Sequence, residues 1–254
     1  IQWALLNRLD LAAKTYAKAI NLGVRRQLQL HIWLALLYLD MEEPERASLV
    51  LDRANELIPE PLYFAMLLFR VYQQATEDIA EPASAILADP SYLLWPGQFP
   101  THFSAKQLRD LAMAEGQHEE ALAVYSKHYP HLLLEHEPAI DPSNYRDAID
   151  LSLVLQIMGD QERANVLLEQ SYAFIQEQST IEWWDDYLIS NVQRLALQDR
   201  KAEALAAIRH AADEGWRSLW WYYLQYDPNL ESIRDEPEFQ AILAEIKSDM
   251  SAQM

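Results

Sequence analysis

The 254-residue chain has no cysteine and only five glycines. Without cysteine it has no disulfide framework, no thiolate metal site and no cysteine nucleophile, and its composition fits a reducing or an oxidising compartment. The few glycines argue against a protein of strands and tight turns, and they leave no Gly-rich phosphate-binding loop.

Basic residues are also scarce. Lys and Arg number 20 against 39 Asp and Glu, which gives a formal net charge of −19. Phosphate backbones repel such a surface, so we expect no direct nucleic-acid binding. The charge either favours a basic partner or serves solubility alone. The longest apolar run, residues 62–69, is far too short for a membrane span, so none is expected.

What is present favours helices. Leu, Ala, Glu and Gln dominate, and hydrophobic residues make up 50% of the chain. Residues 29–59 predict two antiparallel helices, because apolar residues recur at helical spacing on both sides of a break at residues 41–44. Pro44 suits the first turn of the second helix, and Pro59 ends it.

This unit resembles the tetratricopeptide repeat, a two-helix module of 34 residues. The resemblance rests on the small and large residues that the family places at fixed positions, here Leu34, Ala35, Tyr38, Ala47, Leu51, Ala54 and Pro59. It implies that Ala47 lies where the two helices approach most closely.

The pattern recurs along the chain. The small residue equivalent to Ala47 returns as Ala12, Ala121, Ala164 and Ala204. Residues 1–26 read as a truncated first repeat, and residues 62–98 as one divergent helical pair. Arg109 departs from the family, which has a small residue at that position.

Two points divide the chain. Pro96, Gly97 and Pro100 mark a turn-rich joint. The C-terminal end is rich in tryptophan and is similar to the segment that closes tetratricopeptide arrays in bacterial signalling and transcriptional regulators. We therefore predict repeat-like pairs over 1–98, further repeats over 99–215, and a capping segment over 216–254.

The predicted fold is an all-α, right-handed superhelix of antiparallel helix pairs with a C-terminal capping helix. Within the capping segment we expect one helix carrying Trp216, Leu219, Trp220 and Tyr223. A last helix should start near Asp235, and its apolar stripe consists of Phe239, Ile242, Leu243 and Ile246.

Catalytic and metal chemistry find little support. The tract with His128, His131 and His136 is interrupted by Pro130, which spoils a regular metal-binding helix. Adjacent carboxylates such as Glu119 and Glu120 lie on expected exposed faces. The nucleophile elbow Gly-x-Ser-x-Gly is absent. We predict a protein that is not an enzyme, with no cofactor and no metal.

The resemblance implies a concave groove lined by first helices. Carried over by position, its partner-binding residues are Trp33, Leu36, Lys106, Asp110, Arg146, Asp150, Gln156 and Gln193. The chaperone-docking set of Lys and Asn is missing, so the groove suits another peptide or ordered segment.

A second candidate site is aromatic and is formed by Trp183, Trp184, Trp216, Trp220 and Trp221. These residues fill a core or form a binding hot spot. Because Trp220 and Trp221 are adjacent on one helix, at least one of them is expected at a surface or a subunit contact.

The predicted function is protein or peptide binding, as the regulatory or sensory part of a larger bacterial protein. Ile1 falls inside a helical pattern, so we expect a preceding domain, and the compartment stays open between bacterial cytoplasm and periplasm. Two alternatives remain: a small-ligand sensor with an inter-repeat pocket, and a self-association domain that forms a homodimer.

Overall fold

The computed structural model describes residues 8–23, 27–57, 62–95, 98–134, 138–177 and 187–253. All regular structure in these ranges is helical, which confirms the all-α prediction. None of the described helices is long and apolar enough to cross a membrane.

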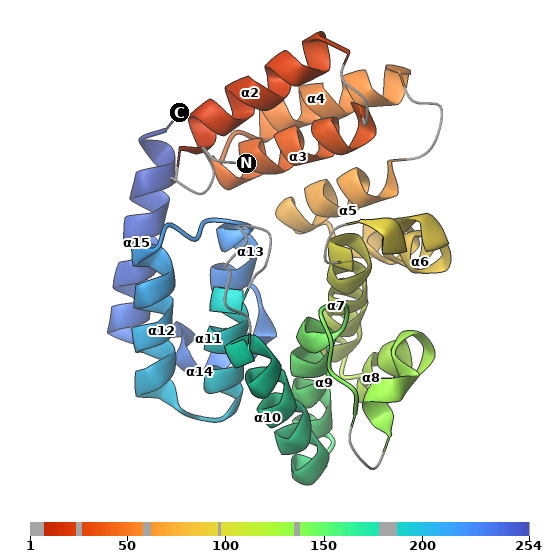
Figure 1. Cartoon of the computed structure of the whole chain (residues 1–254), viewed down its shortest axis with the longest axis vertical. Helices are drawn as coiled ribbons and strands as arrows, with labels where there is room; N and C mark the ends of the chain where they lie inside the picture. Colours follow the sequence, from red (N-terminus) through yellow and green to blue (C-terminus); the bar gives the residue numbers. More distant parts are fainter. Residues whose placement is uncertain are drawn as a thin grey trace.

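Most of the chain consists of helix hairpins that follow one another around an arc (Figure 1). The helix α2 (Leu9–Asn21) comes first. Five pairs follow it: α3 (Gln27–Asp40) with α4 (Pro44–Leu57), α5 (Tyr63–Tyr72) with α6 (Ala80–Ala88), α7 (Phe99–Ala114) with α8 (His118–His128), α9 (Tyr145–Ile157) with α10 (Gln161–Glu177), and α11 (Tyr187–Leu197) with α12 (Lys201–Asp213).

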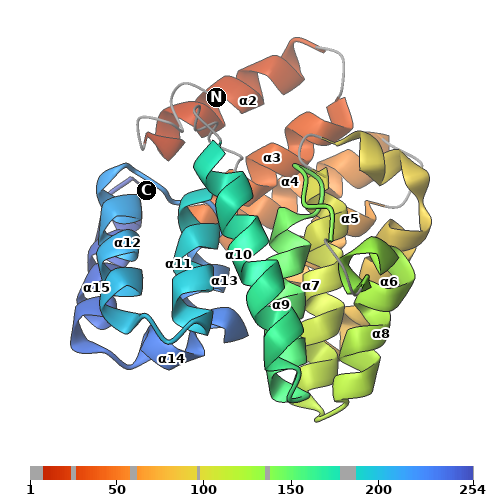
Figure 2. The ribbon, with the colours of Figure 1, turned by 60° about the horizontal axis from the view of Figure 1, so that its bottom comes forward.

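Short 3-10 turns lie between helices: η1 (Thr76–Asp78) joins α5 to α6 within one pair, whereas η2 (Pro90–Leu94) and η4 (Pro130–Leu133) follow the second helices α6 and α8. First helices of neighbouring pairs contact each other, as α3 contacts α5, α7 contacts α9 and α9 contacts α11. Figure 2 shows α7 beside α9. The divergent stretch 62–98 indeed holds a helical pair, α5 and α6.

One local structure ends the first helix of every pair. A residue with positive φ follows the helix, and the next N–H bonds the carbonyl five residues back, as Gln117 does with Ala112 at 2.8 Å. Glycine supplies the positive φ at Gly116 (73°) and Gly159 (85°), where it costs no steric strain. Glu42 (58°), Gln74 (56°) and Asp199 (56°) adopt it elsewhere.

The alanines assigned to the helix crossings have no exposed surface, as expected for residues at a close contact: Ala12, Ala47, Ala121, Ala164 and Ala204 are each 0% exposed. The absence of a larger side chain lets the paired backbones approach, so the local sequence sets the hairpin spacing.

The C-terminal segment turns back into the arc. It comprises α13 (Trp220–Gln225), η5 (Pro228–Leu230), α14 (Glu231–Arg234) and α15 (Pro237–Ser251). Figure 1 shows α13 inside the arc and α15 along α12. The predicted stripe packs there, with Phe239, Ile242 and Ile246 buried and Leu243 half-buried. Trp216, in contrast to the prediction, precedes the helix, because Leu219 adopts a left-handed conformation (φ 50°) directly before α13.

The two ends of the described chain meet. The backbone N–H of Leu9 donates to Gln253 Oε1 at 2.8 Å, and Lys247 pairs with Glu42 at 3.5 Å. Asp40, at the end of α3, accepts from the N–H of Leu219 at 2.9 Å. One hydrophobic cluster therefore unites residues of the first three hairpins with residues of the C-terminal segment.

Candidate functional site

A group of buried polar side chains lies where the first helices face the C-terminal segment. We call it the interior polar cluster. It consists of His102, Lys106, Arg109, Asp110, Asp147, Asp150, Gln193, Asp227 and Asn229.

The turn at Asp227 is the centre of this cluster. Pro228 follows Asp227 and begins η5, and the Asp227 carboxylate accepts from the N–H of Asn229 at 3.0 Å. Lys106 Nζ of α7 lies 3.1 Å from Asp227 Oδ1, and Gln193 Nε2 of α11 donates to Asp227 Oδ2 at 2.5 Å. Two first helices thus hold one turn of the C-terminal segment.

Asp150 of α9 ties the same groups together. Its Oδ1 accepts from Lys106 Nζ at 2.5 Å and from Asn229 Nδ2 at 2.6 Å. Arg109 Nη1 donates to Asn229 Oδ1 at 2.8 Å and lies 3.3 Å from Asp150 Oδ1. Because every one of these side chains is buried, the hydrogen bonds replace water that the fold has excluded.

Two cations, Lys106 and Arg109, offset four carboxylates in this cluster. Burial alone would raise the pKa of Asp150, but the charges of Lys106 and Arg109 outweigh it and lower that pKa to about 2. Burial raises the pKa of Asp110, and the opposing pull of Arg109 and Lys106 does not cancel it. Asp150 is therefore the carboxylate that the two cations hold ionised.

Asp147 has a weaker partner. His102 Nδ1 lies 3.3 Å from its Oδ1, and His102 Nε2 lies 3.9 Å from Asp150 Oδ2. Burial raises the pKa of Asp147, and His102 opposes the shift only in part. Perturbed carboxylates mark functional sites when they lie in a cleft. Asp147 and Asp150 are each 1% exposed, so in this structure they form contacts within the chain.

Four of the eight predicted groove residues meet in the cluster, namely Lys106, Asp110, Asp150 and Gln193. They contact the chain's own C-terminal segment. Whether any of them also touches a partner stays a prediction.

The other four groove residues lie elsewhere. Leu36 is buried in the hydrophobic core, and Trp33 is half-buried beside Trp95 and Phe99. Arg146 is 5% exposed, with its guanidinium 4.9 Å from the Tyr145 ring. Gln156 donates to the carbonyl oxygen of Leu197 at 2.9 Å.

The aromatic candidates are also interior where they are described. Trp183 and Trp184 lie outside the described residues. The expectation of a surface position for Trp220 or Trp221 is wrong, since they are 0% and 3% exposed. The reason is that α13 lies inside the arc, so all its sides are covered. Asp40 accepts from both indoles, through its carbonyl oxygen for Trp220 (2.8 Å) and its carboxylate for Trp221 (3.0 Å).

The histidine tract forms no metal centre in the described part of the chain, where no group of His, Asp and Glu has the geometry to hold an ion. His131 Nε2 lies 3.0 Å from Asn144 Nδ2, in a contact that ties the tract to the start of α9. His136 is outside the described residues.

A hollow of about 280 Å³ borders the cluster at Asp110, and we call it the Asp110 pocket. Its walls come from α5, η1, α7 and the C-terminal segment, and they are formed by Val71, Gln74, Thr76, Ile79, Gln107, Asp110, Leu111, Ala114, Tyr222, Tyr226 and Pro228. The pocket thus lies between the C-terminal segment and the α5–α7 part of the chain.

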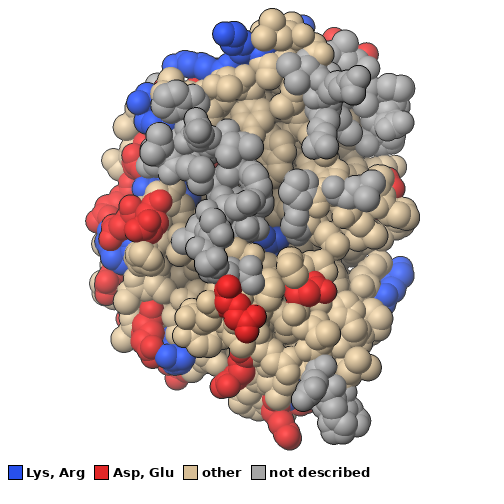
Figure 3. All heavy atoms as spheres, viewed as in Figure 1, with Lys and Arg blue, Asp and Glu red and all other residues tan. Residues whose placement is uncertain are grey.

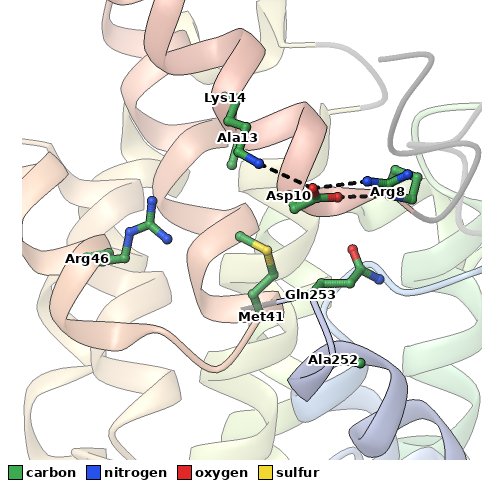
Figure 4. A pocket seen from close by; sticks show the side chains of 8 residues that line it. All are labelled: Arg8, Asp10, Ala13, Lys14, Met41, Arg46, Ala252 and Gln253. Atoms are coloured by element: carbon green, nitrogen blue, oxygen red, sulfur yellow. Dashed lines mark hydrogen bonds and ion pairs between the residues drawn. The ribbon is translucent and has the colours of Figure 1, made fainter.

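A second hollow, of about 420 Å³, lies where the chain ends meet (Figure 4). Arg8, Lys14 and Arg46 line it together with Asp10. Asp10 binds both Arg8 (3.0 Å) and Lys14 (3.5 Å), and Arg46 pairs with Glu43 at 2.6 Å. Because acidic side chains already compensate these exposed cations, the hollow offers an anion little net charge.

Sequence reasoning missed most partners in the cluster. Asp227 and Asn229 carried no repeat signature, and His102 and Asp147 were not singled out by any pattern. Arg109 did carry a signal, because a large cation at a position that normally takes a small residue needs a buried counter-charge.

Comparisons with protein-family models, with curated proteins and with solved structures each gave no match. The class of the protein is therefore defined by its fold alone, an all-helical chain consistent with a helical-repeat architecture.

Proposed function

We propose that this chain is a protein-interaction module of the tetratricopeptide type, serving as the regulatory or sensory part of a larger bacterial protein. The observation that carries the proposal is the inner surface of α7, α9 and α11, whose side chains already hold a turn of polypeptide at Asp227–Asn229. A surface that binds one segment by side-chain hydrogen bonds has the chemistry to bind another.

The chain's own segment is not expected to leave. Burying Trp220, Trp221, Tyr222 and Tyr223 contributes on the order of 6–12 kcal/mol, which is comparable to the whole stability of a domain. A partner would have to supply that free energy to displace α13. The proposal therefore places the partner at the Asp110 pocket, which borders this surface at α7.

Self-association through the Trp-rich end is less well supported. Trp216, Trp220 and Trp221 are 8%, 0% and 3% exposed within a single chain, so they present little area to a second copy. A small ligand in the Asp110 pocket remains the alternative, since a concave apolar site with a few polar groups suits one.

Site-specific photo-crosslinking in the source cell tests the proposal. A photoreactive residue replaces Tyr226, which lines the pocket and is 40% exposed, and separately replaces Tyr172, which is 38% exposed on α10. We expect a protein, identified by mass spectrometry, to be trapped from position 226 and not from 172. Introducing Ala114→Phe into the protein with the photoreactive residue at position 226 fills the pocket and should abolish the cross-linked product.

Equal trapping from both positions, or none from position 226, would argue against a partner at this surface. A melting temperature raised by a metabolite, in the absence of any trapped protein, would favour the small-ligand alternative.

A further inference from the structure

We infer that the Asp110 pocket receives an arginine side chain of the partner, an assignment of ligand chemistry that rests on the proposed function. The pocket combines apolar walls, one carboxylate and two tyrosines. An arginine has an apolar stem, a flat cationic end that stacks on aromatic rings, and donors in a fixed fork.

The charge of the lining is one-sided. Asp110 is its single ionisable acid, and the eleven lining residues include no Lys, Arg or His. Glu77 and Asp78 of η1 are exposed directly after Thr76, which lines the pocket. Arg70 is nearby, and it donates to the carbonyl oxygen of Asp78. A cationic side chain thus meets exposed acidic groups at the mouth and, inside, a carboxylate whose charge Arg109 already offsets in part.

The Asp110 carboxylate keeps room for one more donor. Its Oδ1 pairs with Arg109 Nε (2.7 Å) and Nη2 (2.6 Å), and its Oδ2 accepts from the Tyr222 hydroxyl at 2.5 Å. A carboxylate accepts about four hydrogen bonds, and Asp110 leaves 17% of its side chain exposed. One guanidinium N–H of a ligand would complete the set.

A neighbouring group also lacks a partner. Gln107, from the same wall of the pocket, is 4% exposed, and its Nε2 has no hydrogen-bond acceptor. A buried donor left unsatisfied costs free energy, which a bound acceptor restores. The backbone carbonyl beside a partner's arginine is such an acceptor, so a peptide satisfies both Asp110 and Gln107.

The tyrosines favour arginine over lysine. Tyr226 is 40% exposed at the pocket, and its hydroxyl accepts from Gln74, which fixes the ring. Among its described residues the chain itself stacks arginine on tyrosine, with Arg46 at 4.2 Å from the Tyr38 ring, Arg194 at 4.0 Å from the Tyr172 ring and Arg146 at 4.9 Å from the Tyr145 ring. The same contact at Tyr226 would orient the guanidinium toward Asp110.

The test titrates the whole chain with acetyl-Gly-Arg-Gly-amide and follows backbone amide NMR shifts. The matched probe replaces arginine by citrulline, which keeps the shape and loses the charge, and a third peptide carries glutamate. We expect shifts confined to the end of α5, η1, the second half of α7 and residues 222–228, and binding about 2- to 5-fold weaker for citrulline. The glutamate peptide should not bind.

Two variants separate the pocket from the rest of the surface. Tyr226→Ala should weaken arginine binding several-fold, whereas Tyr172→Ala, of equal exposure and outside the pocket, should leave it unchanged. Asp110→Asn is a poor first choice, because it leaves Arg109 buried without its closest carboxylate.

Equal binding of the arginine and citrulline peptides, shifts elsewhere on the molecule, or no shift at tens of millimolar peptide would overturn the assignment. The two proposals fail separately. If a partner is trapped from position 226 but the peptides show no preference for arginine, only the arginine assignment is contradicted. If the arginine peptide binds but no protein is trapped, the proposed protein-interaction function is contradicted.

Discussion

Asp150 accepts hydrogen bonds from Lys106 and Asn229, and Arg109 lies 3.3 Å away. Asp147, one turn earlier on α9, has His102 as its ion-pair partner at 3.3 Å. The two carboxylates are equally buried, but their pKa values shift in opposite directions, down for Asp150 and up for Asp147. The two pKa values differ because Asp150 has two cationic side chains beside it and Asp147 has only a histidine, and not because one carboxylate is more buried than the other.

This difference predicts unequal costs of neutralisation. Asp150→Asn leaves two buried cations without their shared counter-charge and should lower the free energy of unfolding by about 3–5 kcal/mol at pH 7. Asp147→Asn should cost clearly less, because burial already disfavours its ionised form. Urea unfolding of both variants measures the difference, and equal losses would contradict the assignment of Lys106 and Arg109 to Asp150.

Comparison of the parent protein with Asp150→Asn also gives a prediction for the pH dependence of stability. The folded-state pKa of Asp150, about 2, lies below the unfolded value of about 3.9. Its contribution is therefore complete above the unfolded pKa and is lost as the pH falls from there through about 2. The stability gap between the parent and Asp150→Asn should narrow over that window, and a gap independent of pH would exclude an ionised Asp150.

At the scale of elements, each hairpin combines one type of turn with a buried alanine at the crossing. Gly116 and Gly159 adopt the left-handed turn conformation that glycine favours, and Glu42 adopts it in the first full pair. The helices of that pair, α3 and α4, cross at Ala47, which has no exposed surface.

Ala47→Leu should lower the free energy of unfolding by roughly 1–3 kcal/mol, because the larger side chain forces α3 and α4 apart. Glu43→Gln, four residues earlier, removes only a partly exposed pair with Arg46 and should cost less than about 1 kcal/mol. Denaturation midpoints of the two variants give the comparison. Equal denaturation midpoints would contradict the assignment of Ala47 to the helix crossing.

At the scale of the whole molecule, the C-terminal segment joins distant hairpins. It contributes Trp220 and Trp221 to Asp40, Asp227 to α7 and α11, and Gln253 to Leu9. The face shown in Figure 3 carries scattered acidic side chains over its lower half, in keeping with the net charge of −19. The interior, in contrast, pairs its charges.

A chain ending at Gly215 should be insoluble or melt far below the parent. It loses the stripe of Phe239, Ile242, Leu243 and Ile246, whose burial is worth on the order of 6–10 kcal/mol before entropy is subtracted. A chain ending at Ala252 loses the Gln253 contact to Leu9 but keeps the whole stripe, and it should melt close to the parent. Thermal melts followed by circular dichroism compare the parent with the two shortened chains. A stable, soluble 1–215 chain would show that residues 216–254 do not stabilise the rest of the molecule.

The sequence by itself determined the helices, their pairing and the crossing alanines. These follow from spacing within some 30 residues: the apolar periodicity, Pro44 and Pro237 in first helical turns, and Gly116 and Gly159 at turns. Lys106, Asp110, Asp150 and Gln193, which the repeat positions place on one side of their helices, meet in the interior polar cluster.

Only the tertiary structure decided what those side chains meet. Asp40 bonds residues about 180 positions away, and Arg109 bonds Asn229 across 120. Such contacts depend on how much each hairpin rotates against the next, which the packing of all hairpins sets together and no local pattern encodes. The same rotation brings α13 inside the arc, where both tryptophans are buried and the Asp110 pocket opens beside Tyr222 and Tyr226.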